Sequence, residues 1–286
     1  MRTTVENMYA GIETGGTKTV CAVGSDGAVR ARTQFPTGTD PQSLADKCAE
    51  FFADHPILAL GLGTFGPCDP DPDSPTYGHI LATPKPGWAN ADLVGMLNQR
   101  IGVPITMTTD VNAAALGELR FGAGRGKHSL VYITIGTGIG GGAVVHGRLL
   151  QGGEHPEMGH MLLPQSSGPG VCPYHRNCWE GLASGPGLQA RAGKPAQDLA
   201  DDDPAWDEEA AIVASALHNI TCVLGPQRII VGGGVGSRRA LHERLPALLS
   251  ESLAGYRRTP SIRVPELGSD AGVVGAITLA QYYSQG

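Results

Sequence analysis

Two glycine turns, each flanked by β-branched segments, constrain the fold of this chain more than any other feature. The first spans residues 9–23 and the second spans residues 132–145. Glycine permits positive φ and lets backbone N–H groups approach an anion closely, while alternating Val, Ile and Thr favour strands on both sides of the turn. Each copy then reaches a tight-turn dipeptide, Asp-Gly at 26–27 and His-Gly at 146–147. Two phosphate-holding hairpins predict two related halves that close on one phosphate chain.

The second turn also matches the G-x-G-x-x-G fingerprint of dinucleotide-binding folds, through Gly136, Gly138 and Gly141. That fingerprint needs a helix directly after the glycines, whereas residues 143–147 read as a strand and a turn. The first turn fails as a P-loop in the same way, because Lys18 comes one place late and a strand follows it. A phosphate hairpin is the interpretation that remains for both turns.

Charge and hydropathy exclude two classes of partner. The 286 residues carry 21 Lys and Arg against 27 Asp and Glu, a formal net charge of −6, and the basic doublets lie at 238–239 and 257–258. Nucleic acid is therefore not expected as a partner. The N-terminus lacks the regions of a signal peptide, and no apolar run approaches the roughly 20 residues needed to cross a bilayer. We expect a cytoplasmic protein that does not contact a membrane.

The first half alternates strand and helix signals, which is typical of an α/β fold. The predicted strands after the first hairpin are 28–35, 57–63 and 104–109, and the predicted helices are 41–54, 90–101 and 113–121. Asn90 is expected to cap the second of these helices. Proline-rich segments at 67–75 and 83–88 cannot form helix or central strand. Stiff loops after strand ends are where a small ligand would bind, although surface loops without a task fit them almost as well.

Asp110 is the residue that we expect to act in catalysis. It lies between a predicted strand and a helix, where the partial positive charge of the helix N-terminus favours an ionised carboxylate that can accept a proton. Aspartate is also a preferred N-cap, so capping is the competing interpretation. The position just before the second phosphate hairpin favours catalysis, because it should bring the carboxylate near the transferred group.

Cysteine and histidine gather in one segment of the second half. Cys172, His175 and Cys178 are each separated by two residues, a spacing that lets a tight loop wrap a tetrahedral ion. Two thiolates with two imidazoles indicate Zn²⁺, with His160 as the favoured fourth ligand and His155 as the alternative. A disulfide between the two cysteines is the weaker interpretation, because a reducing compartment disfavours it.

The second half also alternates helices and strands. The predicted helices are 179–191, 207–224, one that begins at residue 237, and about 270–283; the predicted strands are 228–231 and 262–264, and a polar linker covers 194–204. A glycine turn at 232–236 joins a strand to a helix, which suits the sugar or α-phosphate of a nucleotide. Close backbone packing explains these glycines equally well.

With these motifs in view, the chain resembles the ROK family of sugar kinases over nearly its whole length. Residues 11–19 and 135–142 are similar to the two phosphate motifs of the family, and residues 110–114 are similar to its catalytic segment. Residues 157–160 match its Glu-x-x-His element, and residues 172–180 resemble its zinc signature with the trailing Cys-x-Glu.

Two departures from the family pattern point to one branch. Glu13 stands where many members have aspartate, and His175 replaces a cysteine; together with the 83–88 loop, both resemble the fructokinase branch. The resemblance implies an α/β, two-domain, actin/hexokinase-like (ribonuclease H-like) duplicated fold. The implied domains are residues 1–118, joined by the C-terminal helix 270–286, and residues 119–269 with a zinc-binding loop at 152–180.

The activity implied by the resemblance is ATP-dependent phosphorylation of D-fructose to fructose 6-phosphate by a homodimer, with Asp110 as general base and Mg²⁺ and Zn²⁺ as metals. Nucleotide binding is implied for Gly15, Gly16, Thr17, Lys18, Thr137, Gly138, Gly233 and Gly234. Sugar binding is implied for Asn112, Glu157, His160 and Glu180. The implied metal ligands are His160, Cys172, His175 and Cys178, so His160 would serve both the metal and the sugar.

Two other functions compete with fructokinase. One is a hexokinase of broader range that accepts mannose or glucose. The other is a non-catalytic, sugar-sensing regulator, since the family includes repressors with an added DNA-binding segment. The eight residues before the first predicted strand are too few for a helix-turn-helix, and the acidic charge is unfavourable for DNA.

Overall fold

The computed structural model describes residues 7–152, 154–164 and 170–283. Gly153 and residues 165–169 of the predicted zinc loop, and residues 284–286 of the predicted C-terminal helix, lie outside the described residues. The chain forms two compact units. Unit 1 comprises Met1–Gly122, Leu150–His155 and Ser269–Gly286, and unit 2 comprises Ala123–Leu149 and Pro156–Gly268.

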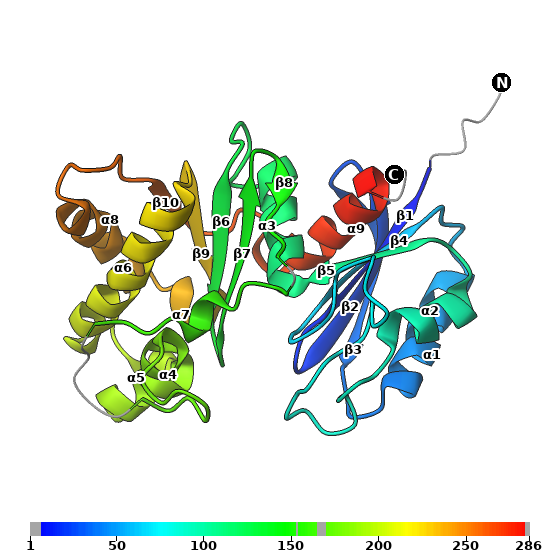
Figure 1. Cartoon of the computed structure of the whole chain (residues 1–286), viewed down its shortest axis with the longest axis horizontal. Helices are drawn as coiled ribbons and strands as arrows, with labels where there is room; N and C mark the ends of the chain where they lie inside the picture. The colour runs from blue at the N-terminus through cyan, green and yellow to red at the C-terminus, as the bar shows by residue number, and fades with distance from the viewer. Residues whose placement is uncertain (1–6, 153, 165–169, 284–286) are drawn as a thin grey trace. The chain divides into compact units, whose positions relative to one another are not determined.

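Unit 1 is built on a five-stranded sheet with the strand order β3-β2-β1-β4-β5. The strands are β1 (Tyr9–Thr14), β2 (Lys18–Ser25), β3 (Ala28–Pro36), β4 (Leu60–Thr64) and β5 (Ile105–Thr109). The helices are α1 (Pro41–Ala53), α2 (Leu93–Ile101), α3 (Asp110–Phe121) and α9 (Ala271–Tyr283). Strands β1, β2 and β3 are antiparallel neighbours, while β4 and β5 run parallel to β1. Figure 1 shows α1 and α2 on one face of this sheet and α3 and α9 on the other.

Alternation along the strands explains this layering. On β2, Val20 and Ala22 pack with Val273 of α9, whereas Cys21 packs on the opposite face with Leu44 of α1. Successive side chains of a strand point to opposite faces, so the continuous apolar run at 20–23 of β2 is covered on both sides. Helix α9, from the C-terminal part of the chain, thus completes the core of unit 1, which also contains the N-terminal strands.

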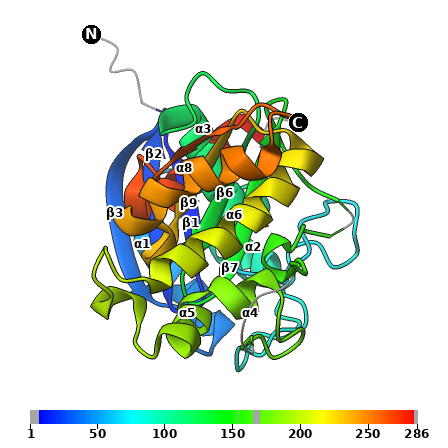
Figure 2. The ribbon, with the colours of Figure 1, turned by 90° about the vertical axis from the view of Figure 1, so that its left-hand side faces the viewer.

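Unit 2 repeats this plan with the strand order β10-β9-β6-β7-β8. The strands are β6 (Leu130–Ile135), β7 (Ile139–Val145), β8 (Arg148–Leu149), β9 (Arg228–Gly232) and β10 (Ser261–Arg263). The helices are α4 (Trp179–Ala183), α5 (Gly185–Ala192), α6 (Ala205–Leu224), α7 (Gly233–Gly236) and α8 (Arg239–Leu253), with short 3₁₀ turns at Met158–His160 and Ala196–Asp198. A third 3₁₀ turn, Gly268–Asp270, spans the point where the chain passes from unit 2 to unit 1. Figure 2 shows α6 and α8 lying across one face of this sheet. No helix of the described residues is both long enough and apolar enough to cross a membrane.

The predicted duplication is confirmed. Each sheet begins with an antiparallel hairpin, β1–β2 or β6–β7, and a tight turn then leads into a third antiparallel strand. The residues of those turns have positive φ in both copies: 48° and 81° at 26–27, and 50° and 79° at 146–147. A parallel strand follows on the other side of each hairpin, β4 beside β1 and β9 beside β6. The two-domain α/β fold is therefore as expected from the two glycine turns.

Two local predictions are wrong. Asp92, not Asn90, caps α2, and its side chain accepts a hydrogen bond from the Gly95 N–H. Asn90 itself has a φ of 59° and belongs to the preceding turn. The helix predicted at 179–191 is broken into α4 and α5 at Ser184, because Pro186 has no N–H to continue a helix and instead lies in the first turn of a new one.

Candidate active site

Two carbonyl groups of the first glycine turn accept hydrogen bonds from Thr37, which lies outside the hairpin. The Thr37 hydroxyl donates to the Gly15 carbonyl at 2.8 Å, and the Thr37 N–H donates to the Thr17 carbonyl at 3.0 Å. The N–H groups of Gly16 and Thr17 have no hydrogen-bond partner within the described part of the chain, and both residues are exposed. A Cβ added at Gly16 would meet no atom of the described residues within 4 Å, its chain neighbours aside. The turn therefore offers backbone donors to an anion, as the sequence predicts.

Thr37 was not anticipated from the sequence as part of this site. It is buried just after β3, where its hydroxyl also lies 3.0 Å from that of Thr19. A lone threonine after a strand carries no local signal of such a role. The register of β2 against β3 brings it to the turn, and that register is a long-range property of the sheet.

The second glycine turn is exposed at its tip and is supported by hydrogen bonds within the turn and from neighbouring residues. The Gly136 N–H donates to the Gly138 carbonyl at 2.9 Å, and the Gly185 N–H donates to the Gly136 carbonyl at 2.7 Å. Thr137 at the tip is exposed. The Ile139 N–H donates to the Glu180 carboxylate at 2.9 Å, so one predicted sugar ligand also supports this turn.

Close packing and ligand binding were the two interpretations of the glycines after β9, and each fits a different glycine. Gly233 has a φ of 87°, and a Cβ there would lie 2.4 Å from the Ile135 carbonyl oxygen, which explains it by close packing. A Cβ added at Gly234 would come within 4 Å of no atom in the part of the chain that the structure describes, apart from its chain neighbours and its own helix backbone. The open position at Gly234, beside the end of β6, is the one that fits the approach of a ligand.

Asp110 lies at the same end of the unit 1 sheet as the first glycine turn. Thr14, Thr64 and Thr109 are in register across β1, β4 and β5. The turn follows Thr14 and α3 follows Thr109, so the two are separated by two strand spacings, about 10 Å. Asp110 is half-buried at the first position of α3, and its carboxylate accepts a hydrogen bond from the Val111 N–H at 2.8 Å.

Capping of α3 belongs to the residue before Asp110. The Thr109 hydroxyl accepts a hydrogen bond from the Asn112 N–H at 3.3 Å. Asn112 is buried, and its amide nitrogen donates to the Thr108 hydroxyl and the Leu150 carbonyl, each at 3.3 Å. A carboxylate in the first turn gains from the helix dipole without being the cap.

Four ligand atoms converge at the predicted metal site in unit 2. The ligand atoms of His160, Cys172, His175 and Cys178 all lie within 4.8 Å of one another. The His160 Nδ1 lies 3.6 Å from the Cys178 Sγ and 3.8 Å from the Cys172 Sγ, and the His175 Nδ1 lies 3.9 Å from the Cys172 Sγ. Neither cysteine is in a disulfide.

These distances fit a tetrahedral zinc site. Zinc bonds of about 2.3 Å to sulfur and 2.0–2.1 Å to nitrogen place neighbouring ligand atoms of a tetrahedron about 3.6 Å apart. Both cysteines are buried, His160 is half-buried and His175 is exposed. The 172–176 loop closes on itself, since Cys172 and Arg176 exchange backbone hydrogen bonds of 3.4 and 3.0 Å. The donor set and its spacing can therefore hold a zinc ion.

Comparison with known proteins assigns the family. The sequence model of the ROK family matches residues 9–282. This chain belongs to the ROK family. A fructokinase from Pediococcus pentosaceus is 39% identical to it over 96% of this chain and 98% of the relative, and a glucokinase from Streptomyces coelicolor is 27% identical over 95% and 96%. The crystal structure of a ROK hexokinase from Thermus thermophilus matches with a TM-score of 0.84 at 29% identity, covering 97% of this chain and 99% of that one. The resemblance and the actin/hexokinase-like fold are confirmed.

Within this ROK chain, the cluster found among the described residues consists of His160, Cys172, His175 and Cys178, so the alternative ligand His155 is not a member of it. His155 belongs to unit 1, where its Nδ1 lies 3.4 Å from the Thr109 hydroxyl. Glu157, the acidic residue of the Glu-x-x-His element, belongs to unit 2, as do the four residues of the cluster. Partial burial raises the pKa of the Glu157 carboxyl, while the charge of His160 opposes that rise and the charge of Glu180 adds to it.

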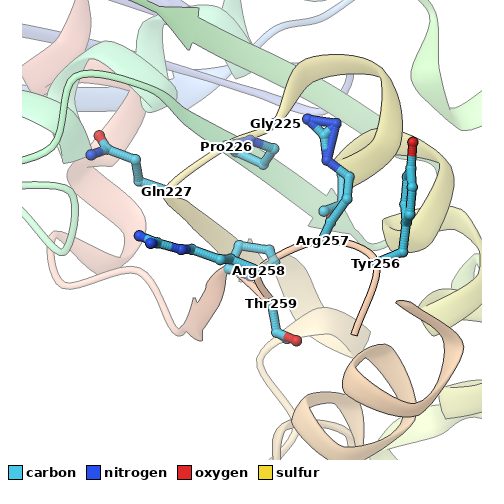
Figure 3. A pocket seen from close by; sticks show the side chains of 9 residues that line it. Gly225, Pro226, Gln227, Tyr256, Arg257, Arg258 and Thr259 are labelled. Carbon is cyan, nitrogen blue, oxygen red and sulfur yellow. The ribbon is translucent and has the colours of Figure 1, made fainter. Parts of the chain in front are cut away.

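A cavity of about 720 Å³ in unit 2 contains none of the predicted residues. It lies where the C-terminal end of α6 meets the segment before β10, and Tyr256, Arg257 and Arg258 line it with Gln227 (Figure 3). Arg257 also donates to the Cys222 carbonyl at 3.4 Å, near the end of α6. A cation is favourable at a helix C-terminus, so this arginine has a structural explanation.

Proposed function

We propose that this chain is an ATP-dependent kinase that converts D-fructose to fructose 6-phosphate. The observation that carries the proposal is the shared end of the unit 1 sheet, where the open glycine turn and Asp110 lie about two strands apart. The 39% identity to a fructokinase over nearly both full lengths supports fructose as the acceptor, against 27% for a glucokinase.

Asp110 is proposed as the general base. Its carboxylate accepts the proton of the primary hydroxyl of the sugar as the oxygen attacks the γ-phosphorus of ATP. Phosphoryl transfer needs mainly positioning and charge neutralisation, which the backbone donors at Gly16 and Thr17 supply to the phosphates. The position of Asp110 at the start of α3 favours the ionised carboxylate that this role requires.

The remaining site residues are proposed on the family resemblance. Nucleotide binding is proposed for Gly15, Lys18, Thr137, Gly138, Gly233 and Gly234, beside the two residues named above. Sugar hydroxyl groups are proposed to bind Asn112, Glu157, His160 and Glu180. The amide nitrogen of Asn112 donates twice inside unit 1, which fixes the orientation of this side chain.

Two metals are proposed. Zn²⁺ would be held by His160, Cys172, His175 and Cys178, where it stabilises the loop that carries them. Mg²⁺ would neutralise phosphate oxygens when bound, and Glu13 is a candidate for holding it. One carboxylate oxygen of Glu13 is buried without a hydrogen-bond partner among the described residues, which suits a hard cation. A homodimer in the cytoplasm is proposed from the resemblance alone.

Steady-state kinetics with fructose, mannose, glucose and N-acetylmannosamine test the proposal. Fructose is expected to give the highest kcat/KM, with fructose 6-phosphate as the product. A higher kcat/KM for glucose would replace fructokinase with a broader hexokinase. Sugar binding without phosphorylation in the presence of ATP and Mg²⁺ would favour a non-catalytic sugar sensor.

A further inference from the structure

The proline-rich loop at 83–88 is fixed to unit 1 by its tryptophan. Trp88 is fully buried, its indole N–H donates to the Gly38 carbonyl at 3.0 Å, and its ring meets Phe65 edge-on with centroids 5.1 Å apart. Gly87 has a φ of 78°, and a Cβ there would lie 1.9 Å from the Thr39 carbonyl oxygen. A loop anchored in this way holds its tip in a defined place.

The tip of the loop places a lysine on the first glycine turn. Lys85, between two prolines, is half-buried, and its ammonium donates to the Gly16 carbonyl at 2.6 Å. The same ammonium lies 5.9 Å from the centre of the Phe65 ring. No carboxylate of the described residues forms an ion pair with Lys85.

An ammonium group has three N–H donors, and the Gly16 carbonyl takes one of them. The neighbouring backbone N–H groups of Gly16 and Thr17 are open to an anion. Any phosphate that accepts from those N–H groups therefore lies close to a positive charge that no acidic side chain neutralises. A lysine in that position attracts phosphate as a compact point charge.

We propose that Lys85 is a nucleotide-binding residue whose ammonium contacts the terminal phosphates of ATP on the first glycine turn. The inference rests on the proposed kinase function and adds a residue from outside the two glycine motifs. A purely structural role, in which Lys85 only ties the loop to the hairpin, is the competing explanation. The two differ in which ligand loses affinity when the charge is removed.

The test compares Lys85→Met and Lys85→Arg with Lys47→Met as a matched control. Lys47, on α1 of the same unit, also lies over a phenylalanine ring, 5.8 Å from the centre of Phe35, but it is exposed and makes no bond to the glycine turn. Calorimetry on the full chain measures the affinities for ATP, ADP and AMP, and melting temperature checks the fold.

Lys85→Met is expected to weaken the binding of ATP about tenfold, which corresponds to the lower end of the range for a hydrogen bond to a charged group. The affinity for AMP should remain nearly unchanged. Lys85→Arg should retain most of the affinity, and Lys47→Met should match the wild type. An equal loss for all three nucleotides, no loss for ATP, or a change confined to the KM for fructose would overturn the proposal. If the wild type binds ATP but phosphorylates no hexose, the proposed function fails while the nucleotide series still tests Lys85.

Discussion

Removing the proposed zinc ion from the Cys/His cluster is expected to destabilise unit 2. The three sulfur–nitrogen distances of 3.6, 3.8 and 3.9 Å are close to the 3.6 Å or so of tetrahedral zinc coordination. A ligand that binds only the folded state, at about 1,000 times its Kd, stabilises that state by about 4 kcal/mol. For a domain of about 150 residues, such as unit 2, a loss of 4 kcal/mol lowers the melting temperature by roughly 8–16 °C.

The assay is elemental analysis of the purified chain followed by thermal unfolding with and without a chelator. We expect about one zinc per chain, since the cluster holds four ligands, and a loss of melting temperature in the range above on chelation. Cys172→Ser should lose the zinc and raise the KM for fructose, because His160 is assigned to both metal and sugar.

Cys222→Ser is the matched control, since Cys222 is exposed and lies outside the cluster. It should keep the metal and the kinetics of the wild type. A chain that binds no zinc and is equally stable and active with the chelator would refute the metal assignment. A zinc-free Cys172→Ser variant with an unchanged KM would separate the metal from sugar binding.

Two further substitutions test interactions inside single units. Arg191→Met should destabilise unit 2 by roughly 1–3 kcal/mol in denaturant unfolding, because it leaves the fully buried Glu209 without its hydrogen-bonded partner while burial, which raises the pKa of Glu209 to about 8, lets that carboxyl take up a proton; a cost below 1 kcal/mol would contradict the pairing. Burial raises the pKa of the Glu13 carboxyl above its ordinary value of 4.5, with the charge of Lys18 opposing. Its contribution to stability is thus complete below pH 4.5 and is lost as pH rises through the raised pKa, so Glu13→Gln should give a flatter pH–stability curve than the wild type, and parallel curves would contradict this.

The duplicated hairpins could be predicted because their signals are local. Glycine turns between β-branched segments, followed by tight-turn dipeptides, specify three antiparallel strands in each unit without reference to the rest of the chain. The Cys/His spacing was equally informative, since three of its four candidate ligands lie within seven residues and the loop between them closes on itself.

Features that depend on long-range contacts could not be predicted. The bonds from Thr37 and Lys85 to the first glycine turn join residues that are far apart in sequence.

The helix break at Ser184 had a local signal in Pro186, but the surrounding helical pattern concealed it. Asn90 and Asp92 are both good caps by residue type, and only the turn that precedes α2 decides between them.

The central claim is that the Asp110 carboxylate accepts the proton of the sugar hydroxyl. The most direct test of this claim is the kcat of the Asp110→Asn variant. Asp92→Asn is the matched control, because Asp92 is also an acid at a helix start in unit 1 and has no proposed chemistry. Asp110→Asn is expected to lower kcat with fructose at least ~100-fold while the affinity for ATP stays close to that of the wild type. A kcat near that of the wild type would contradict the account and leave Asp110 with only its place in the first turn of α3.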